Sequence, residues 1–304
     1  MPKRPVPTLE TAQQQLINDL IPTARSHRLA WSGGETQLLE AGEGLPLLFI
    51  HGGLSQATEW LPLWPQLQVD FKLLAIDRPG HGLATPYDFR GVDTLALADQ
   101  FLAEMVALLG LKQPVLVANS MGARWALEYA VRRPDQVGRL ILVGAPAGIS
   151  PRLPNMMLAL RWPLTRPLMR LMFRHANANS IRQFAAQLLV AHPEKIPESF
   201  LLAKAAGQRR HHTSLLTFAQ RIMAYRTIHP AMLLAEKWSQ LHTPTDFIWG
   251  EADAFHGPAE GKALLAQIPA ATSWQLIPGA GHLPWMDAPA AVAAAIRAAT
   301  GSRS

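Results

Sequence analysis

The chain has 304 residues, a formal net charge of +6 at pH 7 and no cysteine. It is long enough to bury a large core, as one α/β domain with an insertion or as two domains, and it cannot form a disulfide scaffold or a thiolate metal site. No stretch approaches the ~20 apolar residues of a membrane span, and the basic N-terminus lacks the apolar segment of a signal peptide. We therefore expect a cytoplasmic protein without an integral membrane segment.

The first predicted elements are a helix and a hairpin. Residues 1–26 form an N-terminal helical extension, because apolar side chains recur at helical spacing from 8 to 21. Two short strands at 27–31 and 36–41 flank a Ser-Gly-Gly turn.

Two apolar runs, 45–50 and 71–76, are typical of strands buried on both faces of a sheet. Each ends in a glycine-rich turn, His51-Gly-Gly after the first and Asp77-Arg-Pro-Gly-His-Gly after the second. A helix is predicted at about 92–109, because Gly110 stops the helical pattern. Strands that alternate with helices indicate a mostly parallel sheet with right-handed crossovers.

A sharp turn, Asn119-Ser-Met-Gly122, lies between a strand at 114–118 and a helix that extends to Arg133. A serine on a strand-to-helix turn has its hydroxyl pushed outward, above the free N–H groups of the new helix. The usual form of this turn is G-x-S-x-G, and here Ala118 stands at the first small position. Ser120 is therefore a candidate nucleophile that needs a base and an acid from elsewhere in the chain.

The alternation of strands and helices stops after a strand at 139–143. It resumes with two strands and two helices, at 246–249, 273–277, 259–267 and 289–299. The intervening residues 150–241, rich in helix, proline and arginine, predict a helical cap, or lid, over the ligand crevice of the sheet. The α/β core then comprises residues 27–149 and 242–304.

The base and the acid follow later strands. Asp253 comes just after the strand at 246–249, and His282 just after the strand at 273–277. Because the carboxyl ends of parallel strands meet at one edge of a sheet, we expect both side chains beside Ser120. Histidine can accept the serine proton near pH 7, and a carboxylate orients the imidazole and stabilises its charged form.

An oxyanion hole is also predicted from backbone N–H groups. One donor is the N–H of Met121, directly after the nucleophile. The other is the N–H of Gly53 in the turn after the 45–50 strand, with Leu54 as the fallback.

These motifs, in this order, resemble the α/β-hydrolase fold superfamily of the capped serine hydrolase type. The matching pieces span residues 45–290: His51-Gly-Gly, Asp77-Arg-Pro-Gly-His-Gly82, Asn119-Ser-Met-Gly122, Trp249-Gly-Glu-Ala-Asp253 and Gly279-Ala-Gly-His282. The resemblance implies the fold and a Ser120-Asp253-His282 triad and leaves the substrate open. Epoxide hydrolases and dehalogenases of this superfamily need a carboxylate nucleophile, which Ser120 does not supply.

Three functions remain open at this point. A carboxylesterase that works through an acyl-enzyme intermediate is favoured. The Asn-Ser-Met-Gly turn also resembles C–C bond hydrolases of meta-cleavage products, which commonly carry Gly before the Asn and Trp after the catalytic His. Here those positions hold Ala118 and Leu283, with Trp285 two places later. The third possibility is a binding or accessory protein with an idle triad.

Several other residues in or near these motifs are predicted to contact substrate or to be structural. Asn119, Leu283 and Trp285 are predicted substrate contacts. The histidines and charged residues of the two glycine-rich turns, and three tryptophans, are predicted to be structural: His51, His81, Asp77, Arg78, Trp60, Trp64 and Trp125.

The predicted cap is basic. Residues 150–240 carry 13 Lys and Arg against 3 Asp and Glu, a net charge of +10, while the remainder of the chain carries −4. A helix is predicted at 167–175, with Arg170 and Arg174 on one stripe. An apolar acyl tunnel beneath a basic rim would attract anionic substrates or make weak interfacial contact with lipid headgroups, whereas the simpler interpretation is a solvated basic surface.

Flexible apolar surface precedes that helix, at Met156, Met157, Leu160 and Trp162. The expected partner is a small ester with an apolar acyl group. The histidines of the cap have no metal-ligand spacing and the chain has no nucleotide-binding loop, so we expect no metal, no cofactor and no nucleic acid partner. The oligomeric state is left open.

Overall fold

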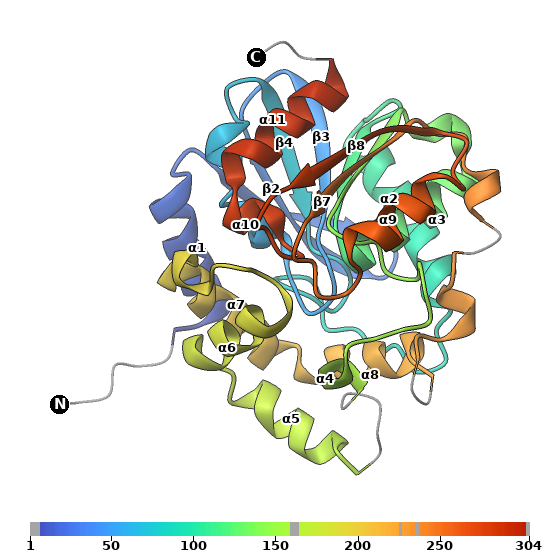
Figure 1. Ribbon diagram of the computed structural model, residues 1–304. Coiled ribbons are helices and arrows are strands. Elements are labelled where there is room, and N and C mark those ends of the chain that lie inside the picture. The colour runs from blue at the N-terminus through green and yellow to red at the C-terminus, as the bar shows by residue number, and fades with distance from the viewer. Residues whose placement is uncertain (1–6, 159–163, 225–226, 235–236, 302–304) are drawn as a thin grey trace.

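A computed structural model describes residues 7–158, 164–224, 227–234 and 237–301 (Figure 1). Its centre is an eight-stranded sheet in the order β1-β2-β4-β3-β5-β6-β7-β8. The strands are β1 Arg25–Trp31, β2 Gly34–Ala41, β3 Leu45–Ile50, β4 Phe71–Ile76, β5 Val115–Ala118, β6 Arg139–Val143, β7 Thr245–Gly250 and β8 Ala271–Ile277. Strand β2 runs antiparallel to β1 and β4, and the other pairs are parallel.

The central strands are buried on both faces because helices cover the sheet from two sides. In β3, Leu48 and Ile50 belong to one apolar core, and Leu47 and Phe49 belong to the other. This alternation follows from the two-residue period of a strand. One face is covered by α2 (Thr94–Leu108), α3 (Ser120–Arg132) and α9 (Pro258–Leu265), and the other by α11 (Pro289–Thr300), while α1 (Leu9–Leu20) contributes to the core on that second side (Figure 1). The predicted mostly parallel sheet between helices is confirmed.

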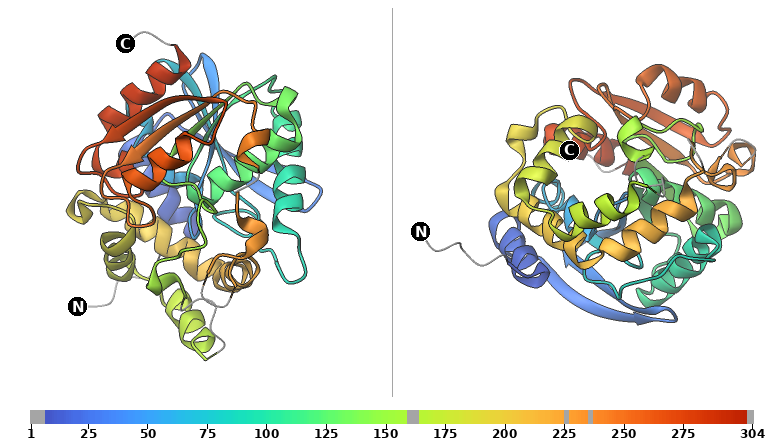
Figure 2. Two further views of the ribbon diagram at one scale, coloured as in Figure 1. Left: turned by 45° about the vertical axis from the view of Figure 1, so that its right-hand side comes forward. Right: turned by 90° about the horizontal axis from the view of Figure 1, so that it is seen from below.

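The chain between β6 and β7 forms helices and, among its described residues, no strand. They are α4 (Asn155–Leu158), α5 (Arg166–Arg174), α6 (Ala178–Leu188), α7 (Glu198–Arg210) and α8 (His212–Ile222). We call residues 150–241 the helical insertion. Seen from below in Figure 2, its helices lie across the lower edge of the sheet. Leu160 and Trp162, expected to add apolar surface here, lie outside the described residues.

The N-terminal helix packs on this insertion. Helix α1 contacts α7, where Arg210 pairs with Glu10 at 3.1 Å and the Arg209 guanidinium donates to the Pro7 carbonyl. Near the other end of the chain, a short helix that the sequence did not indicate, α10 (Pro284–Asp287), follows His282 directly. No helix in the described parts of the chain is both long enough and apolar enough to span a bilayer.

Candidate active site

Ser120 is held in an unusual backbone conformation between β5 and α3. Its φ is +51°, in the left-handed region that residues other than glycine rarely adopt. The turn is tight because α3 starts against β3. A Cβ atom on Gly122 would stand 2.3 Å from the carbonyl oxygen of Ile50, so only glycine fits that position. Ala118, paired with Ile50 across the strands, is fully buried and meets the need for a small residue.

The side chain of Asn119 ties this turn to its neighbours. Its Nδ2 donates to the Val143 carbonyl at the end of β6, at 2.7 Å, and to the His282 carbonyl at 3.3 Å. Its Oδ1 lies 2.5 Å from where a Gly52 Cβ would be. Asn119 therefore holds three strand-end loops together, although it also borders the pocket in front of Ser120 as the predicted substrate contact would.

Asp253 and His282 are brought together, as the sequence predicted. His282 Nδ1 lies 2.8 Å from Asp253 Oδ2, and both side chains are buried. The carboxylate also accepts hydrogen bonds from the backbone N–H groups of Ala145 and Phe255, each at 2.9 Å. Burial would raise the pKa of Asp253, but the charge and hydrogen bond of His282 and these two donors hold it below the ordinary value.

An ionised Asp253 makes His282 Nδ1 the protonated ring nitrogen, which leaves Nε2 with a lone pair. Nε2 is buried and has no hydrogen-bond partner among the described residues. Ser120 and His282 border the same pocket. The ring is therefore oriented as a base with its accepting nitrogen unused.

The predicted oxyanion donors border this pocket too. Gly53, Leu54 and Met121 are among its lining residues, and a Cβ on Gly53 would lie 3.9 Å from the Met121 Cβ. Across the described chain, the backbone N–H groups of Gly53 and Met121 have no hydrogen-bond acceptor. Leu54 has a φ of +54°, so the chain turns sharply just after Gly53. Two free N–H groups from adjacent loops suit a developing oxyanion.

Arg78 and Asp77 hold this loop from behind. Arg78 donates to the carbonyls of His51 and Gly52, at 3.1 and 2.6 Å. The Asp77 carboxylate accepts the N–H groups of Ala57 and Leu83, at 2.7 and 2.6 Å. These four contacts place both residues in the loop-fixing roles expected of them.

His51 and His81 are buried beside Arg78, and each Nδ1 lies 2.9 Å from a backbone oxygen. Burial, together with the Arg78 charge, lowers the pKa of both rings well below the usual value. Both rings thus contact the backbone of their own turns, which is the structural role predicted for them.

Trp285 does not contact the pocket, which corrects the prediction that it binds substrate. The residue is fully buried, its ring stacks on Trp60 at 4.1 Å between centroids, and its Nε1 donates to the Glu59 carbonyl at 2.9 Å. The short α10 turns the side chain back into the core. Leu283, the other predicted contact after His282, does border the pocket.

The pocket walls combine loops of the sheet with the insertion. Its apolar lining includes Leu153, Met157, Phe184, Leu189, Ile222, Met223, Ile228, Phe255 and Leu283. Into this lining projects a charged pair that sequence reasoning missed. Lys204 of α7 forms an ion pair with Glu59 of the core, with 4% and 2% of their side chains exposed. Lys204 Nζ also lies 3.4 Å from Ser55 Oγ. The sequence feature that could have indicated this pair is a lone lysine in the apolar run Leu201-Leu-Ala-Lys-Ala-Ala206.

Residues 46–289 match the family model described as alpha/beta hydrolase fold. The 2-hydroxy-6-oxononadienedioate/2-hydroxy-6-oxononatrienedioate hydrolase 2 of Pseudomonas putida is 26% identical over 238 residues, covering 76% of this chain and 79% of that protein. The 2-hydroxy-6-oxo-6-phenylhexa-2,4-dienoate hydrolase of Burkholderia cepacia is 25% identical over 258 residues, covering 81% and 84%.

Solved structures point to a second group. A carboxylesterase of Bacillus subtilis superposes with a TM-score of 0.75 at 15% identity, covering 97% of this chain and 98% of that one. A thermophilic esterase of Thermogutta terrifontis gives 0.67 at 26% identity, covering 90% and 97%. The sequence relatives thus have names of C–C hydrolases, while these structural neighbours are named esterases.

Proposed function

The chain belongs to the alpha/beta hydrolase fold family, and on that premise we propose that it is a serine hydrolase that cleaves carboxylic esters. The proposal rests on one observation: a strained Ser120 and a buried His282, whose Nε2 lacks a partner in the described structure, border the same pocket. A buried, unpaired acceptor is costly unless a reacting group uses it.

The reaction follows from the placement of these groups. The Ser120 hydroxyl attacks the ester carbonyl and transfers its proton to His282 Nε2, while Asp253 stabilises the imidazolium. The N–H groups of Gly53 and Met121 bind the oxyanion, and losing one such donor would cost ~3–4 kcal/mol in the transition state. The alcohol leaves with the proton from His282, and water then hydrolyses the acyl-enzyme by the same steps.

The helical insertion would act as the cap of this site. It supplies most of the larger apolar wall residues, from α4, α6, α8 and the segments next to these helices. Such a wall would hold an apolar acyl group and exclude water from the oxyanion, which strengthens the N–H donors.

C–C bond hydrolysis is the second candidate, favoured by the names of the sequence relatives. Those names describe carboxylates, "dienedioate" and "dienoate". Two cationic side chains border this pocket, and each already has an acidic partner, Glu59 for Lys204 and Glu260 for Arg152. A substrate carboxylate at Lys204 would be repelled by Glu59 or would have to displace it. The Glu59–Lys204 pair therefore favours a neutral acyl group, and with it the esterase.

A panel of p-nitrophenyl esters of increasing acyl length tests the esterase. Ser120→Ala should lower kcat/KM by ~10⁴-fold or more on every ester that turns over. Ser26→Ala, on the exposed strand β1, is the control and should behave as wild type. If no ester shows Ser120-dependent turnover while a dienone-type C–C substrate does, the esterase assignment is wrong and the second candidate stands.

The acyl charge is tested by a matched pair, p-nitrophenyl butyrate and mono-p-nitrophenyl succinate. Wild type should prefer the neutral ester. Glu59→Gln, which keeps the shape and frees the lysine charge, should raise the ratio of anionic to neutral kcat/KM by ~10-fold or more, as expected for a new hydrogen bond to a charged group. Adding Lys204→Met should remove that gain. An unchanged ratio in Glu59→Gln would show that the ion pair does not select the acyl group.

A further inference from the structure

Helix α5 exposes a stripe of large apolar side chains to solvent. Leu164, two residues before the helix, is 86% exposed, and Leu168, Leu171 and Met172 are 56%, 53% and 53% exposed. The spacing of Leu168, Leu171 and Met172 places these three on one face of α5, and Leu164 precedes them in the chain. The opposite side is used for packing, since Phe173 is 9% exposed and belongs to the core. Exposed apolar residues gathered on one element indicate a contact surface.

A row of arginines lies between the stripe and the packed side of the helix, with Arg166 half-buried and Arg170 and Arg174 exposed. Arg166, Arg170 and Arg174 follow at intervals of four residues, so they share a face of α5. Among the described residues, none of the three has an acidic side chain within ion-pair distance. The sequence has no Asp or Glu at all from 136 to 193. The arginines border a broad surface groove with Arg90 and residues of α8.

The position of α5 leaves this surface accessible. It packs against α7 and α8 on its inner side and is the helix farthest from the sheet, at the lower end of the molecule (Figure 1). The left view of Figure 2 shows it protruding from the same end. None of the stripe residues borders the pocket of Ser120. The surface is therefore separate from the reaction centre.

We propose that α5 docks on an anionic lipid bilayer. The stripe enters the boundary between headgroups and acyl chains, and the exposed Arg170 and Arg174 bind lipid phosphates from the flank of the helix. The long apolar part of an arginine side chain packs along apolar surface while its guanidinium group stays in the polar layer. This suits arginines that flank an apolar stripe on one helix. A second copy of the chain would bring the same arginine row against its own, so like charges oppose self-association through this face.

The experiment is vesicle co-sedimentation with the full chain. Vesicles of phosphatidylglycerol and phosphatidylcholine are compared with vesicles of phosphatidylcholine alone. Wild type should bind the anionic vesicles at least ~10-fold more tightly, and added salt should weaken the binding because charge screening reduces each arginine contact.

Two variants separate the parts of the surface. Leu168→Ser/Leu171→Ser/Met172→Ser removes the stripe, and Arg170→Gln/Arg174→Gln removes two charges. Each should lose ~10-fold or more of the vesicle affinity. The matched controls alter exposed residues elsewhere and should bind as wild type: Val69→Ser/Leu108→Ser for apolarity, and Arg25→Gln/Lys112→Gln for charge.

Turnover of a soluble ester and the unfolding temperature check that each variant is folded, and both should stay at the wild-type level. Because vesicle binding is measured directly, the result does not depend on the proposed esterase activity. Equal binding to both vesicle types, or α5 variants that bind as wild type, would overturn the proposal. It would also be overturned if wild type self-associates in ultracentrifugation, the stripe variant is monomeric and neither binds vesicles, because α5 would then be a protein contact.

Discussion

Two helices of this protein carry charged residues at the same spacing and use them in opposite ways. Helix α3 has Arg124, Glu128 and Arg132 at intervals of four, and α5 has Arg166, Arg170 and Arg174. The middle residue is an acid in α3 and an arginine in α5. In α3 the buried Arg124 and Glu128 and the half-exposed Arg132 neutralise one another, whereas the α5 arginines have no acidic partner among the described residues, and Arg170 and Arg174 are exposed.

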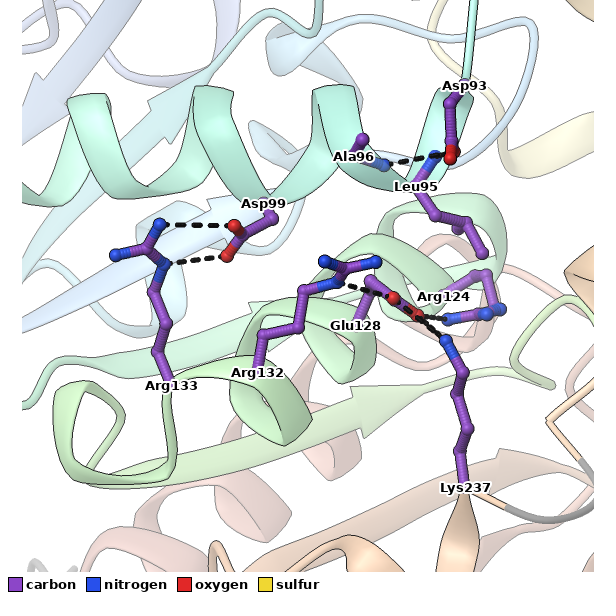
Figure 3. A network of polar contacts seen from close by, with 9 residues as sticks. All are labelled: Asp93, Leu95, Ala96, Asp99, Arg124, Glu128, Arg132, Arg133 and Lys237. Atoms are coloured by element: carbon purple, nitrogen blue, oxygen red, sulfur yellow. Dashed lines mark hydrogen bonds and ion pairs between the residues drawn. The ribbon is translucent and has the colours of Figure 1, made fainter.

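Glu128 is the centre of a closed cluster (Figure 3). Its carboxylate receives Arg124 at 3.0 Å, Arg132 at 2.7 Å and Lys237 at 2.6 Å. Arg124, fully buried, also donates to the Met232 carbonyl at 2.8 Å. Met232 and Lys237 belong to the last part of the insertion. Glu128, the acid at the middle position of α3, therefore connects the insertion to the core. Arg170, at the middle position of α5, makes no such internal contact with the described residues and is free for the proposed bilayer.

The largest effect should come from breaking the α3 cluster. Glu128→Gln leaves Arg124 buried without a counter-charge, so we expect the free energy of unfolding to fall by ~3–5 kcal/mol. Urea denaturation with an unchanged m value measures it. Asp88→Asn, which breaks the exposed pair with Arg90, is the control and should cost less than ~1 kcal/mol. If Glu128→Gln lowered the free energy of unfolding by a similarly small amount, the cluster would not stabilise the contact between the insertion and the core.

The second effect is a dependence on pH. Burial alone would raise the pKa of Glu128, but the hydrogen bonds from Lys237 and Arg132 and the charge of Arg124 lower it to about 2 from an ordinary 4.5. A carboxylate with a depressed folded-state pKa contributes its full stability above the unfolded pKa and loses it as the pH falls toward the folded value. The stability difference between wild type and Glu128→Gln should therefore shrink between about pH 4.5 and pH 2. A difference constant over this window would show that Glu128 is not held ionised by the cluster.

The smallest effect should come from giving α5 the pattern of α3. Arg170→Glu places an acid between two arginines at i−4 and i+4, and exposed pairs of this kind are worth ~0.3–0.5 kcal/mol each. We expect the unfolding temperature to rise slightly, and vesicle binding to fall because the row is interrupted. Arg170→Gln removes the repulsion without adding a pair and should lie between the two proteins. A loss of stability in Arg170→Glu would indicate that Arg170 has an internal role.

The extent of burial explains which element boundaries could be predicted accurately from the sequence. The strands at 45–50, 71–76 and 139–143 were predicted to the residue, because burial on both faces produces an uninterrupted apolar run. Boundaries shifted where one side faces solvent or the backbone is strained. Strand β1 begins at Arg25 rather than 27, and α3 begins at Ser120, since the strained serine is itself the first helical residue.

The site residues also differ in whether a local sequence pattern could locate them. Asp253 and His282 could be predicted because each follows a strand end, and parallel strand ends converge at one edge of the sheet. Trp285 was misplaced because nearness in sequence to His282 says nothing of direction, and α10 rotates its ring onto Trp60. The Glu59–Lys204 pair joins residues 145 positions apart, so no local pattern indicated it.

The sequence by itself determined the fold class, the order of Ser120, Asp253 and His282 along the chain, and the turn that presents Ser120, because periodicity and glycine positions are local consequences of backbone geometry. Only the tertiary structure decided which charges meet. The same spacing on α3 and α5 gives a closed cluster in one and an open arginine row in the other, because the partners Lys237 and Met232 are brought in by the fold from more than a hundred residues away. Whether a charge is satisfied inside the protein or offered to a partner is a property of contacts, and contacts between distant residues are set by packing.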